Sequence, residues 1–506
     1  MSKLEKKLSW DPGFKFENSF SHLPESFYTH TLPLQVKAPK MVMLNNSLAT
    51  VMGLDFTDVR VEDQADLFSG NTLPNGTVPL AQAYAGHQFG NFTMLGDGRA
   101  VLSGEHITPG GQRLDIQFKG SGKTPYSRGG DGRAAIAPML REYVISEAMH
   151  ELGILTTRSL AVITTGEAVL REHGPLPGAI LTRVARSHIR VGTFEFAAAT
   201  RDPEALSALL KYTVKRHYPE LEGNDNLAIE FLKEAMTDQI DLVIEWMRVG
   251  FIHGVMNTDN MALSGETIDY GPCAFMDAYH PNCVFSSIDR RGRYAFGNQA
   301  AIVKWNMARL GETLMPLVSK DLDQATEAVE SVLDGFAFSF NQKWTAMMRA
   351  KLGLFTEQPE DESLVSDLLE CMQCAGADYT NTFLDLTQGR ATEELSEDER
   401  KGLEDKWGKE FGAFNDWHKF WQARRGKDPQ SFEASQHLMQ NSNPSVIPRN
   451  HNVEQALDAA TEGDLKKFYS LLAALQKPYS KTGAEREFYQ RPPSPQERIL
   501  QTFCGT

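Results

Sequence analysis

The sequence has few cysteines for its length, and this limits the classes of protein to which it can belong. Its 506 residues include five cysteines, whereas small domains stabilised by disulfides carry many at close spacing. The one close pair, Cys371 and Cys374, has no second pair and no histidine cluster nearby, so a structural zinc site is not indicated. We therefore expect free thiols in a reducing compartment.

Long apolar runs and an excess of positive charge are also missing. No run approaches the roughly 20 apolar residues of a membrane-spanning helix, and the N-terminal lysines are not followed by the apolar core of a secretory signal. The net charge of -15 argues against a general binder of nucleic acid or anionic membrane, which needs a basic surface. We expect a cytoplasmic, monomeric protein with no nucleic-acid or membrane partner.

The fold class follows from a change of pattern near residue 200. Hydrophobic residues make up 41% of the chain and charged residues 23%, which is ordinary for a globular protein with large cores. We predict an α+β fold with a small β-rich lobe carrying one long helix, followed by a large and mainly helical lobe. The length allows about three domains, and two packed lobes fit equally well.

Periodicity places the individual elements. The strands expected before residue 200 are Ala100–Ser103, Leu114–Lys119, Leu160–Thr165, Glu167–Arg171 and Gly178–Arg183. The helices expected are Met41–Met52, Ala134–Leu152, Pro203–His217, Leu227–Met247, Ala300–Leu317 and Leu322–Lys351.

The stretch HGVMNTDNMALSGETIDYG, residues 253–271, is the most informative about chemistry. It is predicted to form a hairpin, with 261–263 and 267–268 as its strands, that brings Asn260 and Asp269 together. An amide oxygen and a carboxylate are hard ligands that suit Mg²⁺. The alternative is a polar hairpin without a metal.

The same stretch has the spacing of a protein-kinase catalytic loop, in which a histidine precedes a metal-binding asparagine by seven residues. His253 and Asn260 keep that spacing. The position of the kinase catalytic aspartate is Val255, which cannot accept a proton. Asp259 is the only nearby carboxylate that could replace it, so an ordinary kinase mechanism is not supported.

Lys119 ends a predicted strand and Glu142 lies within the predicted helix that follows. A strand lysine held by a helix glutamate is how kinase-like folds aim an ammonium group at nucleotide phosphates. The alternative is that both side chains are solvated at the surface. Order and spacing along the chain favour the paired interpretation.

Two glycine-rich segments have the composition of phosphate-binding loops. Gly96, Gly98 and Arg99 form a turn, and residues 120–133 (GSGKTPYSRGGDGR) leave backbone N–H groups accessible to anions. The first segment also fits a plain hairpin turn. Asp131 and Gly132 equally fit an N-cap of the following helix.

Three arginines and a histidine lie close together in LTRVARSHIRVGTFE. Arg183, Arg186 and Arg190 can bind phosphate through paired N–H groups. They indicate an anion pocket, and the alternative is a basic surface strand paired with acidic neighbours.

Taken together, these segments resemble the selenoprotein O family of kinase-like protein adenylyltransferases. The segments that carry the resemblance are AYAGHQFGNFTMLGDGRA, LDIQFKGSGKTPYSRGGDGRAA, LREYVISEAMHELGI, LTRVARSHIRVGTFE and HGVMNTDNMALSGETIDYGPCAFMD. The resemblance implies a protein-kinase-like two-lobed fold. The domains expected are an N-terminal extension (1–80), an N-lobe (81–200), a helical C-lobe (201–477) and a C-terminal tail (478–506).

The resemblance also implies an activity and its residues. ATP would bind flipped relative to kinases, and AMP would pass to Ser, Thr or Tyr hydroxyls of protein substrates with release of pyrophosphate. Asn260 and Asp269 would hold Mg²⁺, with Mn²⁺ as the alternative metal, and Asp259 would accept the proton. Lys119 would pair with Glu142. The residues expected to contact ATP are Gly96, Gly98, Arg99, Lys119, Asp131, Gly132, Arg183, Arg190 and Asp269.

Two competing functions and a redox device complete the expectations. One alternative is a conventional phosphotransferase, against which Val255 argues because it cannot act as a base. The other is an inactive nucleotide-binding scaffold. The presence of Lys119, Asp259, Asn260 and Asp269 argues against it, since a scaffold has no need of all four. A regulatory disulfide between the activation segment and the tail occurs in relatives, and Cys283 and Cys504 are the residues that would form it here.

Overall fold

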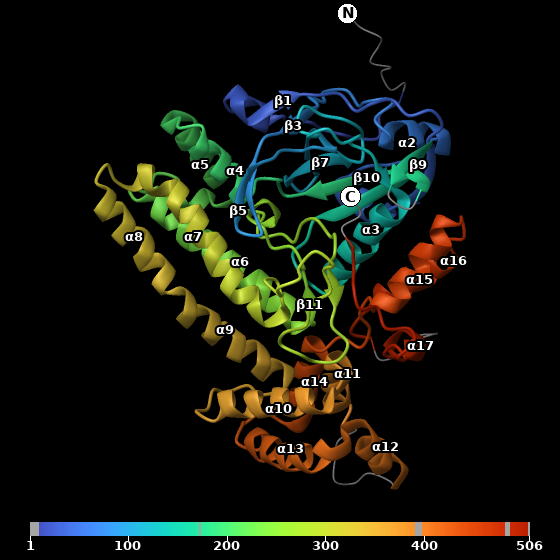
Figure 1. Cartoon of the computed structure of the whole chain (residues 1–506), viewed down its shortest axis with the longest axis vertical. Coiled ribbons are helices and arrows are strands. Elements are labelled where there is room, and N and C mark those ends of the chain that lie inside the picture. Colours follow the sequence, from blue (N-terminus) through green and yellow to red (C-terminus); the bar gives the residue numbers. More distant parts are fainter. Residues whose placement is uncertain (1–9, 172–173, 390–396, 481–485, 504–506) are drawn as a thin grey trace, which may run out of the picture.

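Strands are concentrated before residue 190 and helices after it (Figure 1). The structure, a computed structural model, describes residues 10–171, 174–389, 397–480 and 486–503. None of the helices in these ranges is both long and apolar enough to cross a bilayer. The result is a mixed α and β protein with its sheet at one end and a helical region at the other.

The described residues form one eight-stranded sheet and two small two-stranded ones. The main sheet has the order β1-β3-β6-β7-β10-β9-β2, with β8 also paired to β10, and every pairing in it is antiparallel. Its strands are β1 (Tyr28–His30), β2 (Lys40–Leu44), β3 (Leu80–Gln82), β6 (Ala100–Ile107), β7 (Arg113–Lys119), β8 (Ala134–Ala135), β9 (Arg158–Arg171) and β10 (Gly174–Ala185). The small sheets pair β4 (Ala85–Gln88) with β5 (Asn91–Met94) and β11 (Phe251–Ile252) with β12 (Ala274–Phe275).

Alternation along β7 and β10 gives the sheet one apolar face and one face with buried polar groups. Ile116 and Phe118 point into a core shared with α1 and α2. Gln117 and Lys119 point the opposite way, and the register pairs them with Arg183 and Leu181 of β10. The polar residues of these two strands therefore lie beside one another on one face.

The helices build the rest of the molecule (Figure 1). They are α1 (Asn46–Met52), α2 (Val61–Phe68), α3 (Ile136–Glu151), α4 (Val191–Ala199), α5 (Pro203–His217), α6 (Leu227–Arg248), α7 (Gln299–Val318), α8 (Leu322–Asp334), α9 (Phe336–Lys351), α10 (Asp361–Ala375), α11 (Tyr379–Thr387), α12 (Glu397–Trp407), α13 (Phe411–Arg425), α14 (Phe432–Ser442), α15 (Asn450–Thr461), α16 (Lys466–Leu475) and α17 (Arg486–Gln490).

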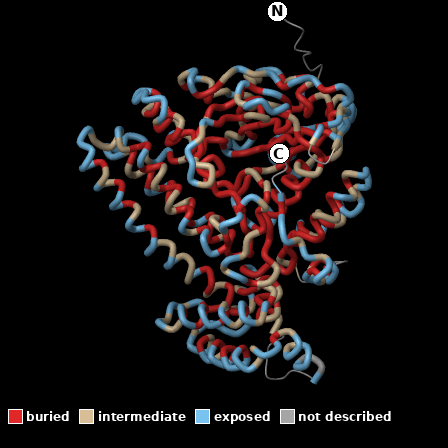
Figure 2. Tube along the Cα trace, in the orientation of Figure 1, coloured by how far each residue is buried: buried red, intermediate tan, exposed pale blue. Residues whose placement is uncertain are grey.

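Helix α3 lies between the sheet and the later helices and is buried around most of its circumference (Figure 2). Leu140 and Val144 belong to the same core as Leu181 of β10 and Leu457 of α15. Because such a helix has no solvent face, its polar residues have partners; Glu147, for example, pairs with Arg158 at 2.6 Å. Polar side chains on α3 can therefore be held rigidly inside the protein.

Most predicted elements are confirmed, and three are corrected. The predicted strands before and after Gly166 are one strand, β9, and the predicted helix 322–351 is interrupted at Gly335 between α8 and α9. The helix predicted for 41–52 begins only at Asn46: Asn45 caps it by accepting a hydrogen bond from the Leu48 amide at 3.0 Å, and the residues before it pair with β9 as an edge strand.

The half-buried His217 makes folding sensitive to acid. Burial, with Arg216 next, lowers the pKa of His217 to about 3 from 6.5, and its Nε2 lies 2.7 Å from the Ser187 hydroxyl. Between these values the unfolded chain binds a proton that the folded chain does not, so stability is full above pH 6.5 and is lost progressively as the pH falls towards 3. At pH 5 the loss from this group is about 2 kcal/mol.

Chemical denaturation at pH 7 and pH 5 tests this. We expect His217→Gln to reduce the difference in unfolding free energy between the two pH values, whereas His437→Gln, at an exposed position on α14, leaves it unchanged. An equal difference in wild type and His217→Gln would contradict the assignment.

Candidate active site

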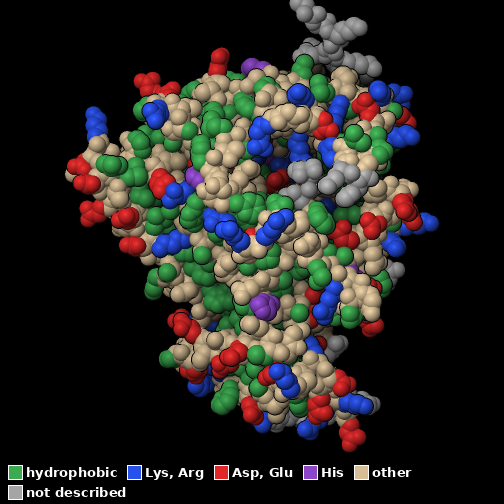
Figure 3. All heavy atoms as spheres, in the orientation of Figure 1, with side chains coloured by type: hydrophobic (Ala, Val, Ile, Leu, Met, Phe, Trp, Pro, Cys, Tyr) green, Lys and Arg blue, Asp and Glu red, His purple; other side chains and the backbone are tan. Residues whose placement is uncertain are grey.

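A cavity of about 550 Å³ opens where the polar face of the sheet, the glycine-rich loop and the 253–271 segment meet. Figure 3 shows a hollow in this face of the molecule, with Lys, Arg, Asp and Glu side chains gathered around it. The predicted site residues that line the cavity are Gly96, Gly98, Arg99, Lys119, Asp131, Gly132, Arg183, Arg190, Asp259, Asn260 and Asp269. A second cavity of about 400 Å³ shares Lys119, Asp259, Asn260 and Asp269 with it and also reaches Glu142.

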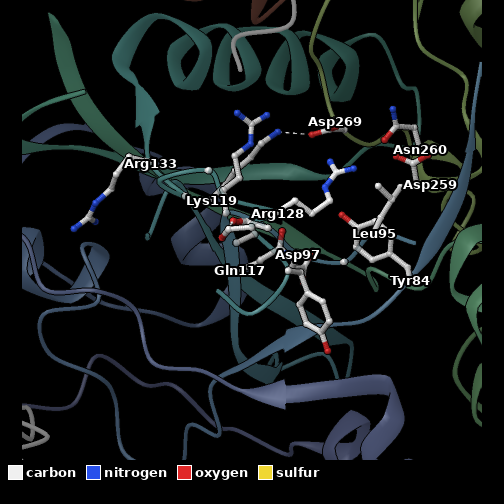
Figure 4. A pocket seen from close by; sticks show the side chains of 18 of the residues that line it. Tyr84, Leu95, Asp97, Gln117, Lys119, Arg128, Arg133, Asp259, Asn260 and Asp269 are labelled. Carbon is white, nitrogen blue, oxygen red and sulfur yellow. Dashed lines mark hydrogen bonds and ion pairs between the residues drawn. The ribbon is translucent and has the colours of Figure 1, made fainter. Parts of the chain in front are cut away.

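A buried cluster of four charged residues lies on one side of the cavity. Lys119 Nζ is 2.6 Å from Glu142 Oε2, and Arg183 Nε donates to Glu142 Oε1 at 2.7 Å. Asp269 Oδ1 accepts from Lys119 and, at 3.0 Å, from Arg183. The lysine–glutamate pair expected from the sequence is therefore present and has an arginine and a second carboxylate added to it. Figure 4 shows two members of this cluster, Lys119 and Asp269, at the cavity.

Burial and charge act in opposite directions on the carboxylates of this cluster. Burial raises the pKa of Glu142, but Arg183 and Lys119 lower this pKa by more than burial raises it, so the net shift is downward. Burial likewise raises the pKa of Asp269, while Lys119 and Arg183 hold it well below its usual range. Both groups stay ionised at neutral pH. The Asp269 side chain keeps 35% of its surface exposed, whereas that of Glu142 keeps 2%.

The backbone that carries Asn260 and Asp269 into the cavity does not form the predicted hairpin. Residues 261–263 and 267–268 do not pair with each other: Ala262 bridges to Arg190, and Thr267 bridges to Thr156. Their backbone groups find these partners across the fold, as when Leu263 N–H donates to Ile189 C=O at 2.9 Å. The predicted hairpin is therefore wrong, although the two side chains that it was expected to join do line one cavity.

The loop before them is fixed by local contacts. His253 Nε2 lies 2.9 Å from the Ile268 carbonyl oxygen, and its ring stacks on Trp246. Asn260 Nδ2 donates to the Val255 carbonyl at 3.0 Å, which leaves the amide oxygen available as a ligand. Asp269 has a φ of 68°, a left-handed conformation that is uncommon for residues other than glycine. Such conformations are often found at functional sites.

Asp259 differs from Asp131 and Asp269 of the same cavity because no cation in the described part of the chain forms an ion pair with its carboxyl oxygens. It is buried, and its Oδ1 has no hydrogen-bond partner among the described residues. Burial raises its pKa to about 6, although Arg190 nearby lowers it. Arg190 Nη1 instead donates to the Asp259 backbone carbonyl at 3.2 Å. A carboxylate with these properties can accept a proton near neutral pH.

The residues present fit a divalent metal held largely by substrate. Asn260 and Asp269 offer one amide oxygen and one carboxylate to the cavity, as Figure 4 shows. Among the described residues, no group of three or more His, Cys, Asp or Glu side chains could hold a metal alone. Mg²⁺ commonly takes one or two protein ligands together with phosphates and water, so this donor set suits it.

The glycine-rich loop folds closely onto the turn that precedes β6. A Cβ on Gly96 would lie 2.5 Å from the Tyr126 ring, and one on Gly98 would lie 2.9 Å from the Tyr126 carbonyl oxygen. Asp131 pairs with Arg171 at 2.9 Å, and α3 begins after Ala135 with no side-chain cap. The N-cap interpretation of Asp131 is therefore wrong.

The arginine segment divides into two parts. Arg183 and Arg190 line the cavity, and Arg190 lies over the Tyr84 ring with its guanidinium carbon 4.2 Å from the ring centroid. Arg186 does not line it; its backbone N–H donates to Glu266 and its Nη1 to the Ser264 carbonyl. An anion pocket is supported, with Arg183 and Arg190 as its members.

Sequence reasoning missed several residues that line the cavity. They are Tyr84, Gln88, Asp97, Gln117, Tyr126 and Arg171; Arg128 and Arg133 also line the cavity and belong to the glycine-rich segment predicted to bind anions. Gln117 could have been found, because it precedes Lys119 by two positions on the same strand and so shares its face. Asp97 could not, because burial among non-neighbouring residues, including Arg190 at 3.8 Å, is not visible in the sequence.

The disulfide expectation is not tested. Cys283 is half-buried, and burial raises the pKa of its thiol to about 12. Cys504 lies outside the described residues.

The cavity brings together cations, a carboxylate with a raised pKa and two oxygen donors that suit a metal, a combination typical of a nucleotide-dependent transferase. Comparison with known proteins gives the family. The family model described as "Protein adenylyltransferase SelO" matches residues 13–476. The chain belongs to the SelO family of protein adenylyltransferases.

Curated relatives match over nearly the whole chain. A protein of Bacillus cytotoxicus is 54% identical over 507 residues, covering 99% of this chain and all of the relative. Proteins of Alkaliphilus metalliredigens and Nitrosococcus oceani are 54% identical over 501 and 497 residues, each covering 98% of both chains. All three carry the name "Protein nucleotidyltransferase YdiU".

Gly86 provides a test of the proton acceptor that leaves Asp259 in place. A Cβ at position 86 would lie 2.3 Å from Asp259 Oδ1. An alanine there must therefore displace either the Asp259 carboxylate or the β4–β5 hairpin to which residue 86 belongs. We expect Gly86→Ala to lower kcat by about tenfold or more, since misplacement by about 1 Å of a catalytic group has such effects.

The control is Gly412→Ala on α13, where a Cβ meets nothing within 4 Å. Steady-state kinetics and thermal unfolding would be measured on both variants. A Gly86→Ala enzyme with normal kcat would show that the position of Asp259 does not limit the reaction.

Proposed function

We propose that the protein transfers AMP from ATP to a Ser, Thr or Tyr hydroxyl of a protein substrate and releases pyrophosphate. The observation that carries the proposal is the placement of Asp259: this carboxylate, whose pKa burial raises to about 6, lines the same cavity as Asn260 and Asp269. Val255, at the position of the kinase base, is buried and cannot take a proton. Proton acceptance is thus moved to a carboxylate four residues further along the chain.

We also propose a protein-kinase-like two-lobed arrangement. A strand lysine on β7, a helix glutamate on α3 and a metal turn after α6 follow one another in the kinase order, which supports it. The divisions at residues 80, 200 and 477 belong to this proposal. The strands β1, β2 and β3 extend the main sheet, so the N-terminal extension would pack as part of the first lobe.

The distribution of cations supports a flipped nucleotide. Four arginines line the cavity: Arg128 and Arg133 of the glycine-rich loop, Arg171 of β9, which pairs with Asp131, and Arg183 of β10, which pairs with Asp269. In this proposal they neutralise the β- and γ-phosphates, which leave together as pyrophosphate, and the α-phosphate faces Asp259. A triphosphate in the usual kinase orientation would instead present its γ-phosphate to the base.

Each residue then has a defined part in the reaction. Glu142 holds Lys119 with its ammonium group directed at the phosphates, and Asp259 accepts the hydroxyl proton, a contribution of about 10²–10⁴-fold. Asn260 and Asp269 would hold Mg²⁺, or Mn²⁺ in its place, and the bound metal would neutralise charge that develops on the phosphate oxygens. Arg183 keeps Asp269 ionised and oriented.

Label transfer from two ATPs tests the proposal. Purified protein with Mg²⁺ and an acceptor protein is given ATP labelled at either the α- or the γ-phosphorus. We expect incorporation from the α-label only, and we expect Asp269→Asn to reduce it about a hundredfold or more because the metal loses its carboxylate ligand. Asp225→Asn, at an exposed position before α6, is the matched control.

The other outcomes are equally informative. Incorporation of the γ-label would establish a conventional phosphotransferase, and nucleotide binding without incorporation from either label, with several acceptor proteins, would favour an inactive scaffold. The relatives' names do not specify the base, so competition with unlabelled GTP, CTP and UTP belongs in the same assay. We expect ATP to compete best.

A further inference from the structure

Four arginines lie on or beside the loop that connects the metal turn to α7, on a protein whose net charge is -15. Arg290 and Arg291 are exposed, Arg293 is half-buried, and Arg309 lies one helical turn after Trp305 on α7. We call Arg290, Arg291, Arg293, Arg309 and Trp305 the arginine surface. The face drawn in Figure 3 carries a group of Lys and Arg side chains close to its hollow.

Two guanidinium groups of this surface lie close together although their like charges repel each other. The guanidinium carbons of Arg293 and Arg309 lie 4.8 Å and 5.0 Å from the same Trp305 ring. Attraction to the ring offsets part of their mutual repulsion. Arg309 also pairs with Glu312 at 2.6 Å, but Arg290, Arg291 and Arg293 form no ion pair with any carboxylate in the described part of the chain. Within the ranges that the structure describes, Arg293 Nε is buried without a hydrogen-bond partner.

Neither carboxylate between the metal turn and α7 pairs with these exposed cations: Asp277 pairs with Arg449 at 2.5 Å, and Asp289 holds the backbone of the loop. Asp289 is buried and accepts hydrogen bonds from the backbone N–H groups of Arg293, at 2.9 Å, and Tyr294, at 2.7 Å. It fixes the shape of the loop and leaves Arg290, Arg291 and Arg293 without a carboxylate partner in the described ranges. An anion from outside the described chain would therefore gain paired N–H donors without displacing an internal carboxylate.

The arginine surface is connected directly to the catalytic loop. The Tyr294 hydroxyl donates to Asn257 Oδ1 at 2.5 Å, and Asn257 precedes Asp259 by two residues. Ile288, which is 50% exposed, lines the second cavity together with Asn257, Asp259 and Asp269. A chain segment that places a hydroxyl beside Asp259 through this cavity would therefore pass the loop that carries the arginines.

We propose that the arginine surface binds acidic residues that flank the modified hydroxyl in the protein substrate. This inference rests on the proposed function and names a substrate class for it, namely segments with Asp or Glu beside the acceptor. A nucleic-acid partner is less well supported, because the cationic area is small on a strongly acidic protein and an exposed isoleucine lies beside it.

Matched acceptor peptides test the substrate class. One peptide carries a serine flanked by glutamates and the other has glutamines at the same positions, and transfer of α-labelled AMP is measured over a range of peptide concentrations. We expect KM for the acidic peptide to be about fivefold lower or more, with the advantage reduced by added salt. The double variant Arg290→Ser/Arg291→Ser should raise KM for the acidic peptide to that of the neutral one.

Lys211→Ser/Lys215→Ser is the control, since it removes two positive charges from exposed positions on α5. It should keep the preference for the acidic peptide. Equal KM values for both peptides with the wild-type enzyme, or an equal loss of preference in the two double variants, would overturn the inference.

A binding measurement separates this inference from the proposed function. Fluorescence anisotropy of the labelled acidic peptide, without ATP, reports binding even if no AMP is transferred. Tighter binding by wild type than by Arg290→Ser/Arg291→Ser supports the surface in either case, and failure of transfer with intact binding counts against the activity alone. Stronger competition by a single-stranded oligonucleotide than by the acidic peptide would overturn the inference in favour of nucleic acid.

Discussion

The buried charge cluster of Lys119, Glu142, Arg183 and Asp269 is the constraint on which the site depends. Buried charges are costly unless each is paired, and here two cations and two carboxylates satisfy one another. The members come from β7, α3, β10 and the turn after residue 268. Because removing any one leaves an uncompensated charge, the cluster joins the sheet, the buried helix and the metal turn into one unit.

The cluster also separates fixed charges from a charge that can change. Arg183 and Lys119 keep Glu142 and Asp269 ionised, whereas burial raises the pKa of Asp259 to about 6. Enzymes commonly place a carboxylate with a lowered pKa and one with a raised pKa in the same cavity and give them different roles in catalysis. In the proposed reaction the permanent charges would position phosphates and metal, and the carboxylate with the raised pKa would exchange the proton.

The sequence predicted those parts of the site in which local pattern and chemical type agree. Helix α3 and strand β7 were found from periodicity, and Lys119 and Glu142 from their places on them. The 261–268 hairpin failed because turn residues show where a chain bends and not which segment it then pairs with. Arg186 and Arg190 look alike in sequence, yet only Arg190 reaches the cavity, since Glu266 and Ser264 hold Arg186 elsewhere.

The contact between the β4–β5 hairpin and the catalytic loop has a consequence for how the enzyme is made. His87 N–H donates to the Thr258 hydroxyl at 2.7 Å across 171 residues of sequence, one position from the contact of Gly86 with Asp259. During synthesis the hairpin leaves the ribosome long before the loop that it must support, and such distant contacts form late in folding. A nascent chain therefore completes strands β1 to β10 before Asp259 can pack against this hairpin, so the proposed base is among the last parts of the cavity to be placed.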